Sequence, residues 1–163
     1  MVNLVIMRHG EAQLHAAADN QRTLTEQGRL EVKQMALWLN ETYRAFDYVW
    51  VSPYVRTRET AALVLETQQQ AAQLQVLPEL VPEASAEALR DKLDLLLAEQ
   101  PDARVLMISH MPLVSFLVEV FTRPGQAPVF STAALCCIDY NPDSGGKLLE
   151  KNSPLDLRLL QRY

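Results

Sequence analysis

The sequence predicts an α/β fold, a three-layer α/β/α sandwich around a mainly parallel sheet of six strands. Short apolar runs, typical of strands buried on both faces, alternate with longer segments of helical periodicity. Strands and helices that alternate in this way form parallel sheets covered by helices on both faces. The length of 163 residues fits one domain, so we expect a single domain over residues 1–163.

The first strand is predicted over residues 2–7, an apolar run rich in β-branched side chains that ends at an Arg-His-Gly-Glu sequence. A polar loop follows, and a helix is predicted over residues 24–40 because its apolar side chains recur on one face. Thr23 or Thr25 can cap this helix, and Thr23 with Glu26 would form a capping box.

The middle of the chain repeats this alternation. A strand is predicted over residues 48–51, which are apolar and end at a Ser-Pro sequence, and a helix over residues 56–70, where apolar residues have helical spacing. A weak strand over residues 75–77 precedes a loop bounded by two prolines. An amphipathic helix with leucines along one face is predicted over residues 85–99.

The last third begins with a strand predicted over residues 104–108, which ends at a Ser-His sequence. A helix is predicted over residues 112–121, with Pro112 at its first position, where a missing backbone N–H is tolerated. Two strands, residues 133–139 and 148–150, are separated by an Asn-Pro-Asp-Ser-Gly-Gly turn, which predicts an antiparallel pair.

Composition excludes several classes of function. The formal charge of −5 argues against a nucleic-acid partner, whose binding proteins are basic. No apolar run has the length of a membrane span, and the N-terminus lacks the features of a signal peptide. The adjacent Cys136 and Cys137 cannot close a loop and suit a reducing compartment, so we expect a cytoplasmic protein. Only three histidines are present, and we expect neither a metal site nor a cofactor.

Polar residues follow three of the predicted strands. Arg8 and His9 follow the first strand, Arg56 comes shortly after the second, and His110 follows the fourth. The carboxyl ends of parallel strands meet at one edge of the sheet, so we expect these side chains to converge. Guanidinium groups bind phosphate oxygens in pairs, and surrounding positive charge keeps a histidine neutral and nucleophilic. The set predicts an anion site suited to phosphoryl transfer.

Several charged residues of the loops and helices have weaker claims. His15 is expected to be solvated or to lie at the rim of the site. Arg22 and Arg58 could extend a basic rim, although surface salt bridges explain them equally well, and Asp19 could orient Arg22.

Four motifs resemble, in order, those of the histidine phosphatase superfamily, which has the phosphoglycerate-mutase-like fold. They are Arg8-His9-Gly10-Glu11, Leu24-Thr25-Glu26-Gln27-Gly28, the segment from Ser52 to Ala61, and Ser109-His110. The resemblance implies that His9 is a nucleophile that carries a phosphoryl intermediate. It also implies that Arg8, Arg56 and His110 hold the phosphate oxygens and that no metal is required.

Within this superfamily the chain is most similar to the SixA-type protein phosphohistidine phosphatases. The similarity includes the short chain and the segments 19–25, 77–80, 109–114 and 152–154. It implies a phosphatase whose partner is a phosphorylated signalling protein, such as a histidine phosphotransfer domain or another phosphorelay protein.

One departure from the wider superfamily bears on the substrate. Members that cleave metabolites carry a glutamate in a Leu-x-Glu pattern after the third strand, and this glutamate protonates the leaving alcohol. Here Leu80 is followed by Val81-Pro82, while Glu79 and Glu83 are out of register. A missing acid costs an alkyl phosphate roughly 10²–10⁴-fold. Phosphohistidine suffers less, because a protonated imidazole leaves as a stable neutral ring, so the departure favours a P–N substrate.

Two alternatives remain open at this point. A small-molecule phosphomonoesterase or mutase of the same superfamily would use Glu79 or Glu83 as its acid. A non-enzymatic module would bind a phosphorylated partner or carry phosphate on His9 without hydrolysing it.

Overall fold

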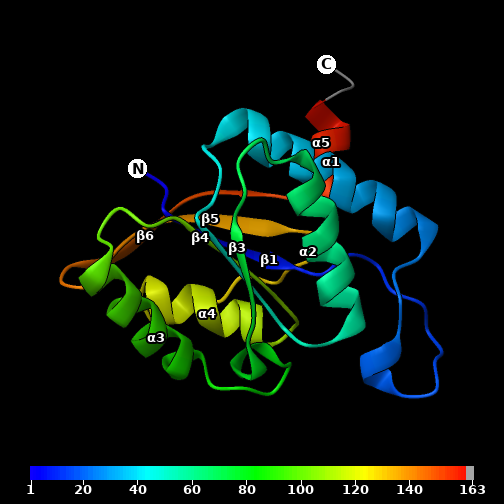
Figure 1. Cartoon of the computed structure of the whole chain (residues 1–163), viewed down its shortest axis with the longest axis horizontal. Helices are drawn as coiled ribbons and strands as arrows, with labels where there is room; N and C mark the ends of the chain where they lie inside the picture. Colours follow the sequence, from blue (N-terminus) through cyan, green and yellow to red (C-terminus); the bar gives the residue numbers. More distant parts are fainter. Residues whose placement is uncertain (161–163) are drawn as a thin grey trace.

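Six strands form one sheet in the order β3-β2-β4-β1-β5-β6 (Figure 1). The computed structural model describes residues 1–160, and residues 161–163, which the sequence assigns to the same domain, lie outside the described part. The strands are β1 (Leu4–Arg8), β2 (Tyr48–Val51), β3 (Gln73–Val76), β4 (Val105–Ser109), β5 (Leu135–Asn141) and β6 (Gly145–Asn152). The first four are mutually parallel, whereas β5 pairs antiparallel with both β1 and β6. The predicted, mainly parallel six-stranded sheet is confirmed.

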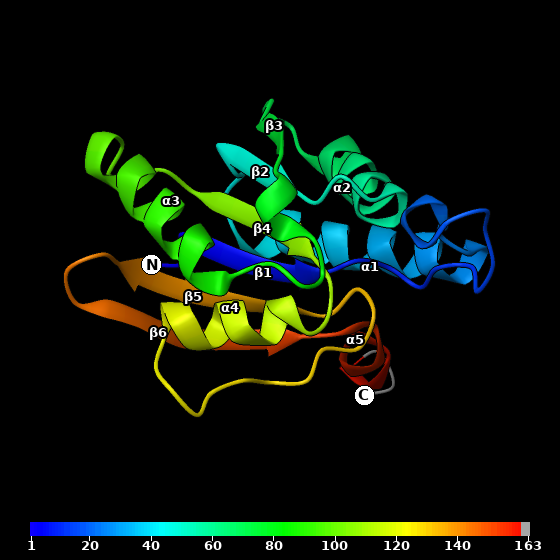
Figure 2. The same cartoon turned by 90° about the horizontal axis from the view of Figure 1, so that it is seen from below.

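Helices cover both faces of this sheet (Figure 2). They are α1 (Glu26–Thr42), α2 (Val55–Thr67), α3 (Ala86–Glu99), α4 (Leu113–Phe121) and α5 (Pro154–Leu160), with two 3-10 turns, η1 (Asp19–Gln21) and η2 (Pro78–Leu80). Alternate β1 residues divide between two cores, because successive strand side chains point to opposite faces. Leu4 and Ile6 pack with α3 and α4, while Val5 and Met7 pack with α1 and α2. The predicted three layers are therefore present.

The start of α1 differs from the predicted capping box. Thr25 is the N-cap, and its hydroxyl oxygen accepts a hydrogen bond from the backbone N–H of Gly28 at 2.9 Å. Thr23 instead accepts a backbone hydrogen bond from Gln13, because the neighbouring Leu24 forms an extended bridge with the segment after His9. The predicted capping box of Thr23 and Glu26 is therefore wrong, because Thr23 belongs to the extended segment that pairs with Gln13 rather than to the helix.

The C-terminal part has more regular structure than the sequence predicts. The last strand, expected over residues 148–150, extends over Gly145–Asn152, because the hairpin turn is tight. The side-chain oxygen of Asn141 accepts hydrogen bonds from two backbone N–H groups of this turn. Beyond it, α5 packs against α1.

The two cysteines lie next to each other in β5 and point to opposite faces of the sheet. Cys136 belongs to the core under α3 and α4, and Cys137 to the core under α1 and α2. Both thiols are free and buried, and burial raises the pKa of each to about 12. Within residues 1–160, no helix combines the length and the apolarity required to cross a membrane.

Candidate active site

The ends of the two central strands bring the predicted histidines together. β1 and β4 are adjacent and parallel, with Arg8 in register with Ser109, so His9 and His110 leave the sheet side by side. Their ring centroids are 5.2 Å apart, and both side chains are almost completely buried. The first turn of α2 adds Arg56, whose Nε lies 3.3 Å from Nε2 of His9.

Hydrogen bonds define the protonation of His9. Its Nδ1 lies 2.7 Å from the carbonyl oxygen of Gly10, which can only accept, so Nδ1 carries the proton. Nε2 then has a free lone pair, consistent with its contact to the N–H donor of Arg56. Burial and, to a smaller extent, the charges of Arg56 and Arg8 together lower the pKa of His9 to about 4, against the hydrogen bond to Gly10, which raises it. His9 is therefore a neutral imidazole with its unprotonated nitrogen in cationic surroundings.

His110 is oriented by the turn that follows β2. Its Nε2 lies 2.8 Å from the hydroxyl of Ser52, and that hydroxyl accepts a hydrogen bond from the backbone N–H of Tyr54. Among the described residues Nε2 is the one acceptor within reach of the hydroxyl proton, so we assign the ring proton of His110 to Nδ1. The Tyr54 ring packs edge-on against His110, at 4.8 Å between centroids. Burial lowers the pKa of His110 to about 3, helped by His9 and Arg56.

Each of the two arginines donates a hydrogen bond to a backbone carbonyl of a different segment. Arg8 donates from Nη1 to the carbonyl oxygen of Phe130 at 2.9 Å. Arg56 donates to the backbone carbonyl of Asp19 at 2.8 Å and to its carboxylate at 3.3 Å, and its guanidinium stacks on the Tyr54 ring. The Asp19 carboxylate also pairs with Arg22 at 3.0 Å, so Asp19 connects two cations. The prediction that Asp19 orients Arg22 agrees with this contact.

Two buried donors at the site have no protein partner among the described residues. They are Nδ1 of His110 and Nε of Arg8. Buried polar groups normally have a hydrogen-bond partner, so unpartnered donors beside a cationic cluster indicate an anion site. These donors, together with Arg56 and the unprotonated Nε2 of His9, form a cationic set of the kind that phosphoryl transfer requires.

Comparison with known proteins agrees with this chemistry. Residues 4–82 match the sequence pattern of the histidine phosphatase superfamily (branch 1). Over 158 residues the chain is 34% identical to the phosphohistidine phosphatase SixA of Escherichia coli (strain K12), covering 97% of this chain and 98% of that protein. The chain belongs to the histidine phosphatase superfamily.

Two further relatives agree with this membership. The phosphohistidine phosphatase SixA homolog of Haemophilus influenzae is 29% identical over 164 residues, covering 94% of this chain and 98% of that protein. The solved structure of the protein histidine phosphatase SixA complexed with tungstate superposes with a TM-score of 0.89 at 35% identity, covering 94% of this chain and 98% of that chain. The resemblance inferred from the motifs and the phosphoglycerate-mutase-like fold are confirmed.

Other predicted residues of this histidine phosphatase lie at the margin of the site. His15 is exposed and lines a cavity of about 300 Å³ that also includes Asp19 and Arg22, which agrees with the predicted rim position. Arg58 is exposed on α2. Glu83 is exposed, whereas Glu79, in η2, is half-buried, and one of its carboxylate oxygens is buried with no hydrogen-bond partner among residues 1–160.

Sequence reasoning gave no role to Ser52 and Tyr54, although both lie inside a recognised motif. Their contacts with His110 join residues more than 50 positions apart, so only the folded sheet reveals them. Thr60 was also missed. Its hydroxyl donates to the carbonyl of Arg56 and accepts from the N–H of Gly10, which connects α2 to the turn after His9. The signal available in the sequence was the threonine at helical spacing from Arg56.

Within residues 1–160 no group of three histidine, cysteine, aspartate or glutamate side chains is placed to hold a metal ion.

Proposed function

We propose that this protein is a protein phosphohistidine phosphatase that works through a covalent phosphoryl intermediate on His9. The observation that carries the proposal is the state of His9, with Nδ1–H held by Gly10 and an unprotonated Nε2 beside Arg56. Similarity to SixA over nearly the whole chain supports phosphohistidine as the substrate class. The tungstate complex of SixA supports an oxyanion site in the same fold, because tungstate resembles phosphate in shape and charge.

In the first step, Nε2 of His9 attacks the phosphorus in line with the leaving imidazole. The new bond joins phosphorus to Nε2, and the P–N bond to the substrate breaks as that imidazole takes up a proton from solvent. Arg8, Arg56 and the Nδ1–H of His110 hold the oxygens as negative charge spreads over them. Phosphorylated His9 keeps its Nδ1 proton, and the Gly10 carbonyl continues to accept it.

In the second step, water attacks phospho-His9 in line. The bond from phosphorus to Nε2 breaks, the proton lost from water is taken up by solvent or product, and His9 returns to its neutral form. The low pKa of His9 favours this step, because a weakly basic imidazole is a good leaving group.

The leaving group distinguishes this activity from ester hydrolysis. An alkoxide needs a proton donor, and the candidates are Glu79 and Glu83. The unpartnered buried oxygen of Glu79 is the specific observation in favour of a phosphomonoesterase or mutase. If Glu79→Gln abolished turnover of a phosphate ester but spared phosphohistidine, this second activity would be supported.

The proposal extends to the setting of the reaction. The partner is a phosphorelay protein, such as a phosphorylated histidine phosphotransfer domain, in the cytoplasm, and no cofactor takes part. The three nitrogen donors and the nucleophile also fit a module that keeps its phosphate. Stoichiometric phospho-His9 that never turns over would support that module against the phosphatase.

The test compares three substrates with one preparation: a phosphohistidine protein, an aryl phosphate and a phosphoglycerate. We expect preference for the phosphohistidine protein and loss of at least about 10³-fold in rate with His9→Ala, because the nucleophile is gone. His15→Ala is the matched control, since His15 is the exposed histidine of the same chain. Undiminished turnover by His9→Ala would refute the assignment.

A further inference from the structure

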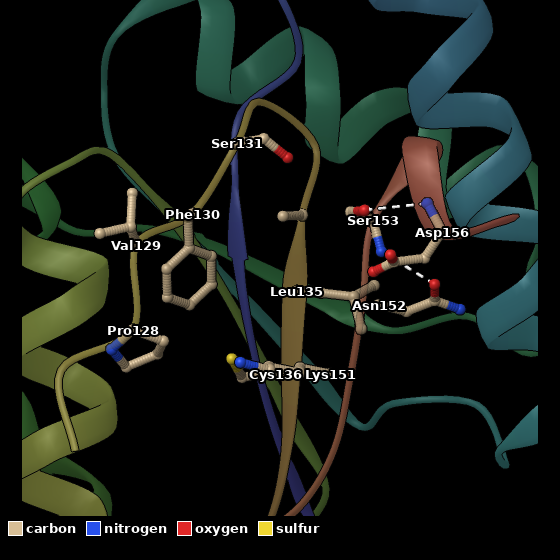
Figure 3. Close-up of a pocket in the computed structure, with 11 residues that line it drawn as sticks. Pro128, Val129, Phe130, Ser131, Leu135, Cys136, Lys151, Asn152, Ser153 and Asp156 are labelled. Atoms are coloured by element: carbon tan, nitrogen blue, oxygen red, sulfur yellow. Dashed lines mark hydrogen bonds between the residues drawn. The ribbon is translucent and has the colours of Figure 1, made fainter. Parts of the chain in front are cut away.

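We propose that a cavity beside the phosphate site binds the polypeptide segment that flanks the phosphohistidine of the substrate protein. This inference rests on the proposed function and names the surface that would make the enzyme selective for proteins. The cavity, here called the flanking cavity, has a volume of about 350 Å³ (Figure 3). One side of it is the segment Pro128–Ser131, and the opposite side is the end of β6 with the start of α5.

The flanking cavity adjoins the phosphate site at Phe130. The carbonyl oxygen of Phe130 accepts the hydrogen bond of Arg8, while the same residue lines the cavity. The following backbone is attached to the nucleophile, because Ala133 donates to the carbonyl of His9 at 2.9 Å and Arg8 donates to that of Ala134 at 3.0 Å. A ligand with its phosphate on His9 enters the cavity only if it extends past Phe130, as a polypeptide does and a compact metabolite does not.

The two sides of the flanking cavity have different chemistry. Pro128, Val129 and Phe130 form an apolar side, and the side chain of Val129 is 88% exposed. The polar side carries charges of both signs, with Lys151 and Asn152 at the end of β6 and Asp156 in α5. Lys151 is exposed and lies opposite Cys136 in the β5–β6 register, and it has no ion pair in the described part of the chain. An apolar side chain and a carboxylate or backbone carbonyl of a bound segment would satisfy both sides.

The cavity is formed without any partner, which lowers the entropic cost of binding. The hydroxyl of Ser115, in α4, donates to the carbonyl of Pro128, so the apolar side is attached to a helix. Ala134 donates to the carbonyl of Ser131, and Ala133 between them has a positive φ of 62°, which closes the turn into β5. The segment therefore presents Val129 to solvent from a fixed backbone.

The experiment uses the full chain and two substrates: a histidine phosphotransfer domain phosphorylated on its histidine, and free phosphohistidine. Val129→Asp places a charge on the apolar side, and Lys151→Glu replaces the cation of the polar side with a second carboxylate beside Asp156. Leu95→Asp, at a leucine that is 72% exposed on α3 and absent from the cavity lining, is the matched control. Circular dichroism and the rate on free phosphohistidine show whether each variant is folded.

We expect Val129→Asp to raise KM for the phosphorylated domain about tenfold, which is the effect typical of substituting an interface residue that contributes to binding. Rates on free phosphohistidine should stay within about twofold of the parent, since the phosphate site is intact. Lys151→Glu should also raise KM for the phosphorylated domain, and Leu95→Asp should leave the rates on both substrates unchanged.

Equal rates of parent and variants on the phosphorylated domain would overturn the inference while leaving the phosphatase intact. Concentration-dependent dimerisation that Val129→Asp abolishes would also overturn it, because the cavity would then bind a second copy. A parent that hydrolyses neither substrate would instead refute the proposed function itself.

Discussion

The ionisation state of His9 is the property on which the chemistry depends, and it can be measured directly. The perturbation is a change of pH from neutral to about 5.5 in a His15→Gln background, which leaves only His9 and His110 to observe. With a pKa of about 4, His9 is about 3% protonated at that pH, whereas an ordinary histidine with a pKa near 6.5 would be about 90% protonated. His110, with a pKa of about 3, stays neutral as well.

The assay is long-range proton–nitrogen NMR of the imidazole rings, which reports both charge and tautomer. We expect His9 to carry its proton on Nδ1 and His110 to carry its proton on Nδ1, with no titration down to about pH 5. Titration of His9 near 6.5 would refute the argument from burial and arginine charge. A proton on Nε2 of His9 would refute the assignment of the nucleophilic nitrogen.

The same shift contributes to stability with a definite sign. The unfolded chain takes up a proton on His9 below pH 6.5, but the folded chain does so only below about pH 4. The free energy of unfolding therefore falls as the pH is lowered through this window, by about 3 kcal/mol for His9 in total. Denaturant unfolding of the parent and of His9→Gln at pH 7 and at pH 4.5 measures this contribution, and equal pH dependence in both would contradict it.

Three further variants test the surroundings of the site. Ser52→Ala leaves Nε2 of His110 without its hydrogen-bond partner and should lower kcat, measured as steady-state turnover, by roughly tenfold. An unchanged kcat would show that the hydroxyl does not orient the ring. Asp19→Asn removes a negative charge beside Arg56, so inorganic phosphate should inhibit competitively with an inhibition constant roughly two- to fivefold lower at low salt. A higher inhibition constant would show that Asp19 mainly positions the arginine. In Gly28→Ala the new Cβ would overlap a backbone oxygen of the neighbouring turn. The free energy of unfolding should therefore fall by about 1–3 kcal/mol, measured as a lower thermal midpoint. An unchanged midpoint would show that this turn adjusts freely.

The central part of the site was predictable because local signals and the sheet agree there. The apolar runs of β1 and β4 are buried on both faces, and each is followed by one polar residue and then by a histidine. The rule that parallel strands share a carboxyl edge was then enough to bring His9 and His110 together. Neither run contains information on its neighbours in the sheet, so the order of the strands could be learned only from the structure.

Contacts between distant segments account for the parts that were not predicted. Thr23 and Thr25 are equally good caps in isolation, and the choice is made by Glu11, whose carboxylate accepts from the Thr25 hydroxyl at 2.8 Å. The missed helix α5 is different, because its signal was local. Ser153 accepts from the N–H of Asp156, and Pro154 occupies the first helical position, which is a recognisable helix start.

The buried pair of cysteines in β5 has a consequence for oxidative stress. Peroxide reacts with exposed thiolates, and a thiol with a pKa of about 12 is almost entirely protonated at neutral pH. Cys136 and Cys137 face opposite sides of the sheet and are each almost completely buried, although Cys136 also contributes to the floor of the flanking cavity, while the proposed nucleophile is an imidazole nitrogen. A phosphatase built in this way would continue to hydrolyse phosphohistidine under oxidising conditions that inactivate enzymes with a thiolate nucleophile.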